Sequence, residues 1–270
     1  MPAATGTLYV VATPIGNLGD LSERARSVLE SVDLVACEDT RHTGALLSRL
    51  GLRQTLVSLH EHNERRRLPE LTARLVSGSS VALVSDAGTP LLSDPGFPLV
   101  RAAIAAGCPV VAIPGPSAAL AALVTSGLPP YPFTFCGFPP RRSGKRRSFF
   151  ARFASFDHTL VVLESPHRLL EALADAETML GDRRAAICRE LTKLHEETLR
   201  GTLSSVRNAL ADRERIRGEV VLVIAGRTEN AGAEEDEGDP GDAEEWDEEP
   251  ANEPGEECET EECENEESPG

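Results

Sequence analysis

The stretch SDAGTPLLSDPG, residues 85–96, decides how the first half of the chain is interpreted. It directly follows the apolar run Val81–Val84, and an apolar run bounded by turn residues is typical of a buried strand. Ligands of open α/β sheets bind at the carboxyl ends of strands. The stretch therefore predicts a strand-end loop in which Asp86, beside Gly88, faces a ligand rich in hydroxyl and amine groups. We expect Asp94, Pro95 and Gly96 to shape the turn into the next helix.

Similar apolar runs recur through the first half of the chain and alternate with helical patterns. This alternation predicts right-handed crossovers and a mainly parallel sheet. A proline-rich segment at 127–142 breaks the rhythm and predicts a domain boundary, and the shorter connections beyond it predict a mixed sheet. The expected strands are Leu8–Ala12, Leu34–Cys37, Thr55–Leu59, Val81–Ser85 and Val110–Ile113, then Phe133–Cys136, Thr159–Leu163, Ala185–Arg189, Glu197–Arg200 and Val220–Ala225.

The charge of the chain is divided very unevenly. The formal net charge is −17, but residues 229–270 contain 21 acidic and no basic side chains. The remaining 23 acidic side chains stand against 27 basic ones, so residues 1–228 are mildly basic and are compatible with a polyanionic partner. We therefore expect two α/β domains, 1–126 and 127–228, followed by a disordered acidic tail at 229–270.

Composition also excludes some classes of protein. No apolar run reaches the roughly 18 residues that a membrane span needs, and the N-terminus lacks the basic region of a signal peptide. The cysteine spacing does not predict a metal site. We expect a cytoplasmic protein without a metal or a membrane partner.

The loop TPIGNLGD at 13–20 follows the first strand. Its two glycines allow a sharp bend, but the pattern is neither a dinucleotide-binding motif nor a P-loop. Asp20 is expected to cap the next helix, and Glu23 is placed to complete a capping box.

Two further loops of the first half have two possible interpretations each. In CEDTRHTGALL (37–47), Asp39 either caps a helix with Arg41 as its ion pair or belongs to a polar rim beside Asp86, and both can hold together. In IPGPSAALAAL (113–123), Ser117 either caps a helix or leaves free backbone N–H groups for a ligand.

The segment RRSGKRR at 141–147 contains five cationic side chains and precedes three phenylalanines. Clustered cations with aromatic neighbours favour contact with an RNA backbone and unstacked bases, although a solvated helix start with core phenylalanines would give the same pattern. The candidate RNA-binding residues are Arg141, Arg142, Lys145, Arg146 and Arg147.

Two strand ends of the second half carry carboxylates together with bases. ESPHR at 164–168 begins with Glu164, and RELTK at 189–193 contains Arg189, Glu190 and Lys193. Salt bridging alone is the alternative explanation for both clusters.

Together these motifs resemble the bacterial 16S ribosomal RNA (cytidine-2′-O)-methyltransferases of the tetrapyrrole methylase superfamily. The resemblance extends from about Gly6 to Arg227, and GFPPR (137–141) departs from the commoner GFLPR at Pro139, which affects only the expected path of the hinge. The matching segments are ATPIGNLGDLSERA, EDTRHTGALL, SDAGTPLLSDPG, PGPSA, GFPPR, ESPHR and RELTK.

The resemblance implies two α/β domains with S-adenosylmethionine between them, a homodimer, and methylation of cytidine 1402 in the decoding centre of the small ribosomal subunit. It also implies a set of cofactor-binding residues. These are Pro14, Asp86, Ala87, Gly88, Ser117, Ala118, Glu164, Leu191 and Gly218.

Residue chemistry adds candidates for catalysis. A ribose 2′-hydroxyl is a weak nucleophile, so Glu190 or Glu164 is expected to accept its proton, and Lys193 and Arg189 to orient it or hold the adjacent phosphate. Two alternatives remain, methylation of a tetrapyrrole or corrin precursor and a ribosome-binding module without activity. Uptake of S-adenosylmethionine distinguishes an enzyme from the module, and the cations at 141–147 weigh against the tetrapyrrole precursor.

Overall fold

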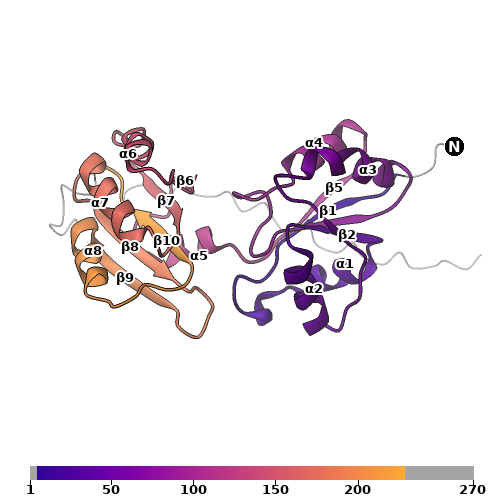
Figure 1. The fold of residues 1–270 in the computed structure, drawn as a ribbon, viewed down its shortest axis with the longest axis horizontal. Helices are drawn as coiled ribbons and strands as arrows, with labels where there is room; N and C mark the ends of the chain where they lie inside the picture. The colour runs from indigo at the N-terminus through magenta and orange to yellow at the C-terminus, as the bar shows by residue number, and fades with distance from the viewer. Residues whose placement is uncertain (1–4, 229–270) are drawn as a thin grey trace, which may run out of the picture. The chain divides into compact units, whose positions relative to one another are not determined.

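The computed structural model describes residues 5–228, which form two five-stranded sheets with helices on their faces (Figure 1). The N-terminal sheet has the strand order β3-β2-β4-β1-β5, and every neighbouring pair is parallel. The strands are β1 (Leu8–Val11), β2 (Leu34–Cys37), β3 (Leu56–Ser58), β4 (Val81–Val84) and β5 (Val110–Ile113).

Successive residues of a strand point to opposite faces, and both faces of this sheet are covered. Leu34 and Ala36 pack with α3 and α4 on one face, whereas Val35 and Cys37 pack with α1 and α2 on the other. Figure 1 shows these two helix pairs on either side of the strands. The helices are α1 (Glu23–Ser31), α2 (Thr40–Arg49), α3 (Glu64–Val76) and α4 (Phe97–Ala105).

The C-terminal sheet has the order β6-β7-β10-β8-β9, in which β6 and β7 are parallel and the other pairs are antiparallel. One face packs against α6, α7 and α8, and the other packs against α5. The strands are β6 (Phe133–Gly137), β7 (Thr159–Glu164), β8 (Arg184–Arg189), β9 (Glu197–Thr202) and β10 (Val220–Ile224), and the helices are α5 (Ala118–Thr125), α6 (Ser143–Ala151), α7 (Leu169–Leu180) and α8 (Leu203–Ala211).

The prediction of a parallel first sheet and a mixed second sheet is confirmed, and all ten expected strands form. The predicted cap of α1 is wrong. Asp20 ends a short 3-10 helix, Leu18–Asp20, and Ser22 caps α1 by accepting a hydrogen bond from Ala25 N. The domain boundaries stay a prediction, and the acidic segment 229–270 lies outside the described residues.

Within residues 5–228, no helix is both long and apolar enough to cross a membrane. The same part of the chain holds no cluster of three or more histidine, cysteine or acidic side chains arranged to bind a metal ion.

Candidate functional site

Three loops that follow β1, β4 and β5 are tied together at the carboxyl edge of the N-terminal sheet. The backbones of Thr13 and Gly88 exchange two hydrogen bonds, of 2.9 and 3.0 Å, and Thr89 Oγ1 donates to the Pro116 carbonyl at 3.1 Å. Gly88 has a φ of +80°, and a Cβ there would lie 3.3 Å from Ile15 Cγ2. Glycine is therefore favoured where the two loops approach each other, chiefly because of the positive φ.

A cavity of about 400 Å³ opens beside these loops and is also lined by residues of the C-terminal sheet. The cavity contains eight of the nine predicted cofactor-binding residues. Pro14 does not line it, and its neighbour Ile15 does. The eight are Asp86, Ala87, Gly88, Ser117, Ala118, Glu164, Leu191 and Gly218.

Both interpretations of the loops after β2 and β5 have a structural basis. Asp39 caps α2, accepts from Arg41 N at 2.8 Å and forms an ion pair with the Arg41 guanidinium at 3.0 Å. Its own backbone N–H donates to Asp86 Oδ1 at 3.2 Å, so the loop also positions a cavity carboxylate. Ser117 caps α5 and still lines the cavity.

Glu164, at the end of β7, is a buried carboxylate of the cavity with half of its hydrogen-bonding capacity in use. Its Oε1 accepts from Ser165 N at 2.7 Å and pairs with Arg168 at 2.6 Å. Its Oε2 is buried and has no hydrogen-bond partner among the described residues. A buried acceptor without a partner is costly, so this oxygen suits a ligand that brings an N–H or O–H donor.

The cavity also contains residues of the 85–96 stretch that were expected only to shape a turn. Leu92 and Asp94 both line it. Leu91 and Ser93, on either side of Leu92, have φ values of 75° and 77°, which non-glycine residues rarely adopt. Gly96 does begin α4 as expected, with a φ of +118°. The repeated aspartate of SDAG and SDPG was the available signal for Asp94.

The RELTK turn has the same alternation of backbone conformation. Glu190 and Thr192 have φ values of 53° and 64°, and Leu191 between them faces the cavity. The Glu190 carboxylate accepts from Lys193 Nζ at 2.9 Å and from Glu219 N at 3.0 Å. The hydrogen bond from Lys193 lowers the pKa of Glu190. A carboxylate stabilised in this way is a weak proton acceptor.

The Lys193 side chain lies against the first loop, because a Cβ on Gly16 would be 2.3 Å from Lys193 Cγ. Arg189 donates from Nε to Glu197 Oε2 at 3.1 Å and from its guanidinium to the Arg217 carbonyl at 2.8 Å. Among the described residues that line the cavity, none is Arg189, Glu190 or Lys193. Salt bridging, the alternative left open for this cluster, accounts for the contacts of all three.

The basic segment at 141–147 divides into buried and exposed members. Arg146 is 1% exposed and its guanidinium pairs with Asp175 and Glu171, so its inclusion among RNA-binding residues is wrong. Arg147 is more exposed but also pairs with Asp175, at 2.7 Å. Arg141, Arg142, Lys145 and Arg147 are all exposed, and of these four only Arg147 forms an ion pair within residues 5–228.

The phenylalanines that follow the basic segment belong to the core. Phe149 and Phe150 are buried in the cluster between α6 and the C-terminal sheet, and Phe153 packs against the same cluster. They are not available for stacking with bases. Two other aromatic residues, Phe135 and Phe138, line the cavity, and Phe138 is 55% exposed. Neither was predicted as a site residue, although GFPPR contains Phe138.

Comparison with known proteins gives a consistent result. The family profile "Tetrapyrrole (Corrin/Porphyrin) Methylases" matches residues 7–207. A "Ribosomal RNA small subunit methyltransferase I" of Xylella fastidiosa (strain 9a5c) is 49% identical over 235 residues, covering 86% of each chain.

Two solved structures share the fold at low sequence identity. The uroporphyrin-III C-methyltransferase of Thermus thermophilus, complexed with S-adenyl homocysteine, has a TM-score of 0.55 and 18% identity, covering 83% of this chain and 99% of that one. The methyltransferase CobJ has a TM-score of 0.62 and 17% identity, covering 82% and 95%.

The fold and the matched region define an S-adenosylmethionine-dependent methyltransferase of the tetrapyrrole methylase type. Within that class, the chain belongs to the ribosomal RNA small subunit methyltransferase I family.

Proposed function

We propose that the cavity binds S-adenosylmethionine and that the chain methylates the 2′-oxygen of a cytidine in 16S ribosomal RNA, at position 1402 in the decoding centre. The single observation that carries this proposal is the cavity itself. It brings together eight residues that the family resemblance implies for the cofactor, from five separate segments of the chain. The identity to small-subunit methyltransferases supplies the class of acceptor.

The residues fit the cofactor in two ways. The Oε2 atom of Glu164, which has no partner among the described residues, accepts a hydrogen bond from an amino or hydroxyl group of the cofactor. Gly88 and Gly218, both at positive φ, line the cavity with backbone, and at Gly218 the Glu190 side chain lies 2.3 Å from where a Cβ would be, so the chain packs closely behind this wall. When bound, the cofactor supplies a methyl group that is already activated by the positive charge on sulfur. Much of the protein's task is therefore to hold the acceptor oxygen in line with that methyl group.

The contacts within the RELTK turn support a positioning role rather than proton transfer. Lys193 Nζ forms ion pairs with Glu190 Oε1 at 2.9 Å and with Glu219 Oε2 at 3.3 Å. The Lys193 side chain also packs against Gly16 of the first loop. This ionic cluster connects the N-terminal loop to the strand end that presents Leu191. Glu190 and Lys193 therefore shape the cavity wall from behind, and Arg189 supports the same wall through its hydrogen bond to the Arg217 carbonyl, next to Gly218.

The mouth of the cavity suits an unstacked nucleoside. Phe138 and Leu92 leave 55% and 45% of their surface exposed there, which is unusual for large apolar side chains. Enzymes that modify a base or sugar inside folded RNA take the nucleotide out of its stack and hold it against aromatic or apolar side chains. Phe138 provides such a surface for the cytosine ring.

The exposed cations Arg141, Arg142 and Lys145 lie only a few residues beyond Phe138 in the sequence. Free cationic side chains near an acceptor pocket contact RNA phosphates and release counterions. We place the RNA backbone along this segment, with the buried Arg146 supporting it from within the fold.

A homodimer is part of this proposal. Leu120 and Val124 lie one helical turn apart on α5 and are 51% and 73% exposed, so they present an apolar face. We propose that a second copy covers this face. Activity on ribosomal RNA would also place the protein in the cytoplasm.

The test uses the full chain and small ribosomal subunits that lack the modification. Mass spectrometry of the digested RNA is expected to show 2′-O-methylcytidine after incubation with S-adenosylmethionine. Asp86→Ala is expected to weaken cofactor binding in calorimetry, with Asp212→Ala, an exposed carboxylate at the end of α8, as the control. Subunits that stay unmodified, or unchanged cofactor affinity in Asp86→Ala, would contradict the proposal.

A further inference from the structure

Four carboxylates line the cavity, and their surroundings differ. Glu164 pairs with Arg168 at 2.6 Å, and Glu219 pairs with Lys193 at 3.3 Å while remaining 68% exposed. Asp86 accepts from the backbone N–H of Asp39 and belongs to the cofactor-binding set. Asp94 is half-buried and forms no ion pair within the described part of the chain.

The segment that carries Asp94 is held firmly in an uncommon conformation. Leu91 and Ser93 both have positive φ, a region that non-glycine residues adopt only under strain. Glu64 Oε1 of α3 accepts from Gly96 N at 2.8 Å and anchors the far end of the segment. Gly137 of β6 lies so close that a Cβ there would be 3.1 Å from Ser93 Oγ. The segment is therefore fixed from both halves of the protein with Asp94 at the cavity.

The geometry points to Asp94 as the catalytic base that accepts the proton of the ribose 2′-hydroxyl. This inference rests on the proposed function, and it replaces the sequence-based assignment of that role to Glu190 or Glu164. Within the part of the chain that the structure describes, the carboxylates of Glu190 and Glu164 pair with cations, whereas that of Asp94 pairs with none and lines the cavity.

The step balances without another reactant. The 2′-oxygen forms a bond to the methyl carbon, and the carbon–sulfur bond breaks with its electron pair remaining on sulfur. The hydroxyl proton moves to the Asp94 carboxylate and from there to water. The positive charge of the sulfonium is lost, and one proton is released.

The electrostatic surroundings suit this task. Burial raises the pKa of Asp94 to about 6, and the nearby carboxylates of Glu38 and Asp86 add to the rise while Ser85 opposes it. A base with a pKa close to the working pH is ionised and still accepts a proton effectively. His60, at the end of β3, interacts with Glu38 and so belongs to the same charged neighbourhood.

The decisive variant is Asp94→Asn, which keeps the size of the side chain. Single-turnover methylation of unmodified small subunits is expected to fall by about 100-fold or more, the usual contribution of a general base. Affinity for S-adenosylmethionine, measured by calorimetry, and affinity for the subunit are expected to stay within about threefold. A rate within about threefold of wild type, or a parallel loss of cofactor affinity, would overturn the assignment.

The pH dependence provides a second readout. Below about pH 6 the Asp94 carboxylate is protonated, so the wild-type rate is expected to fall with acidification, and this decline is expected to be absent in Asp94→Asn. Glu38→Gln removes a neighbouring negative charge and is expected to move the decline to lower pH. His60→Gln is expected to retain the decline. A decline that persists in Asp94→Asn assigns the titration to another group and overturns the proposal.

Glu190→Gln separates the two candidate bases. The rate of single-turnover methylation by Glu190→Gln is expected to stay within about tenfold of wild type. A larger loss in Glu190→Gln, together with an active Asp94→Asn, would show that Glu190 is the base. Failure of the proposed function gives a different result, since the wild-type protein would then bind no S-adenosylmethionine or leave the subunit unmodified.

Discussion

The Nε of Arg146 donates a hydrogen bond of 2.7 Å to Oδ2 of Asp175, and both side chains are almost completely buried. The contact joins α6 to α7, and Asp175 also accepts from Ser143 and Arg147. Arg146, one of the five clustered cations at 141–147, is therefore part of the C-terminal core.

Arg146→Met is expected to lower the free energy of unfolding by about 3 kcal/mol, because it leaves a buried carboxylate with fewer partners. This loss of stability is at the low end of the range for breaking a buried ion pair, because Arg147 and Ser143 remain hydrogen-bonded to Asp175. Urea denaturation measures it. Arg142→Met, at an exposed position, is the control and is expected to change stability by less than about 0.5 kcal/mol. Equal stability of the two variants would show that the pair contributes little.

The exposed cations lead to a prediction about salt dependence. Replacing Arg141, Arg142 and Lys145 with alanine is expected to reduce the slope of log affinity against log salt by up to about 2 if all three contact phosphates. Equilibrium binding to small subunits at several salt concentrations measures the slope.

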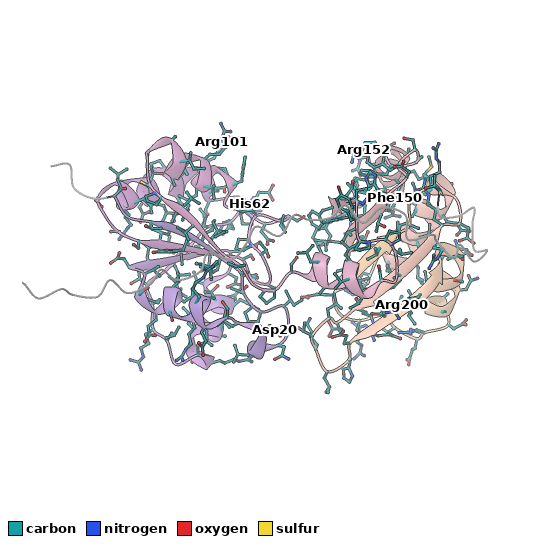
Figure 2. The ribbon with its side chains drawn as sticks, turned by 180° about the vertical axis from the view of Figure 1, so that it is seen from behind. Asp20, His62, Arg101, Phe150, Arg152 and Arg200 are labelled. Carbon is teal, nitrogen blue, oxygen red and sulfur yellow. The ribbon has the colours of Figure 1, made fainter. Side chains whose placement is uncertain are left out.

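The matched control for this experiment removes three exposed cations from N-terminal helices, Arg24, Arg49 and Arg101. Figure 2 shows Arg101 extending from α4 away from the sheet. If this control lowered the slope as much as the first triple variant, the RNA-binding surface would not lie at the basic segment.

Phe138→Ala is expected to weaken productive binding of the subunit by about 1–3 kcal/mol, the range for loss of one base–aromatic stack. The KM for the subunit should rise while the calorimetric affinity for S-adenosylmethionine stays unchanged. Phe138→Trp should restore binding, because it restores an aromatic face. Tyr131→Ala, which removes an 87% exposed ring outside the cavity lining, serves as the control. Equal effects at both positions would remove the proposed stacking role.

Glu197 gives a prediction about acid stability. Hydrogen bonding from Arg213, with help from Arg189, lowers the pKa of Glu197 to about 2. A carboxylate with a lowered folded-state pKa stabilises the fold above its ordinary pKa, and the stabilisation is lost as pH falls from about 4.5 to about 2.

Glu197→Gln is therefore expected to reduce stability at pH 7 by about 1–2 kcal/mol, less than full linkage implies because the side chain is partly exposed. The difference between variant and wild type should shrink as the pH falls towards 2. Thermal unfolding across this range measures both. A difference that stays constant with pH would contradict the proposed charge interaction.

Much of this protein was predictable from local patterns. All ten expected strands form. The central strands β2, β4 and β10 were the plainest, because a strand buried on both faces needs nearly continuous apolar side chains. The family resemblance supplied nine cofactor-binding candidates, and eight of them line one cavity. Those of the N-terminal half meet there because parallel strands bring their carboxyl ends to one edge. Asp39 shows the limit of such interpretation, since one residue both caps α2 and positions Asp86 through its backbone.

The tertiary structure decided which charged side chains are free. By itself the sequence determined the sheets, the strand-end loops and the family, because these depend on residue order and local chemistry. It could not separate Arg146 from Lys145, or Glu190 from Asp94, since each pair is chemically similar. Burial and the folded conformation make the difference. Asp175 lies 29 residues from Arg146, and within residues 5–228 Lys193 pairs with Glu190 whereas Asp94 has no ion pair.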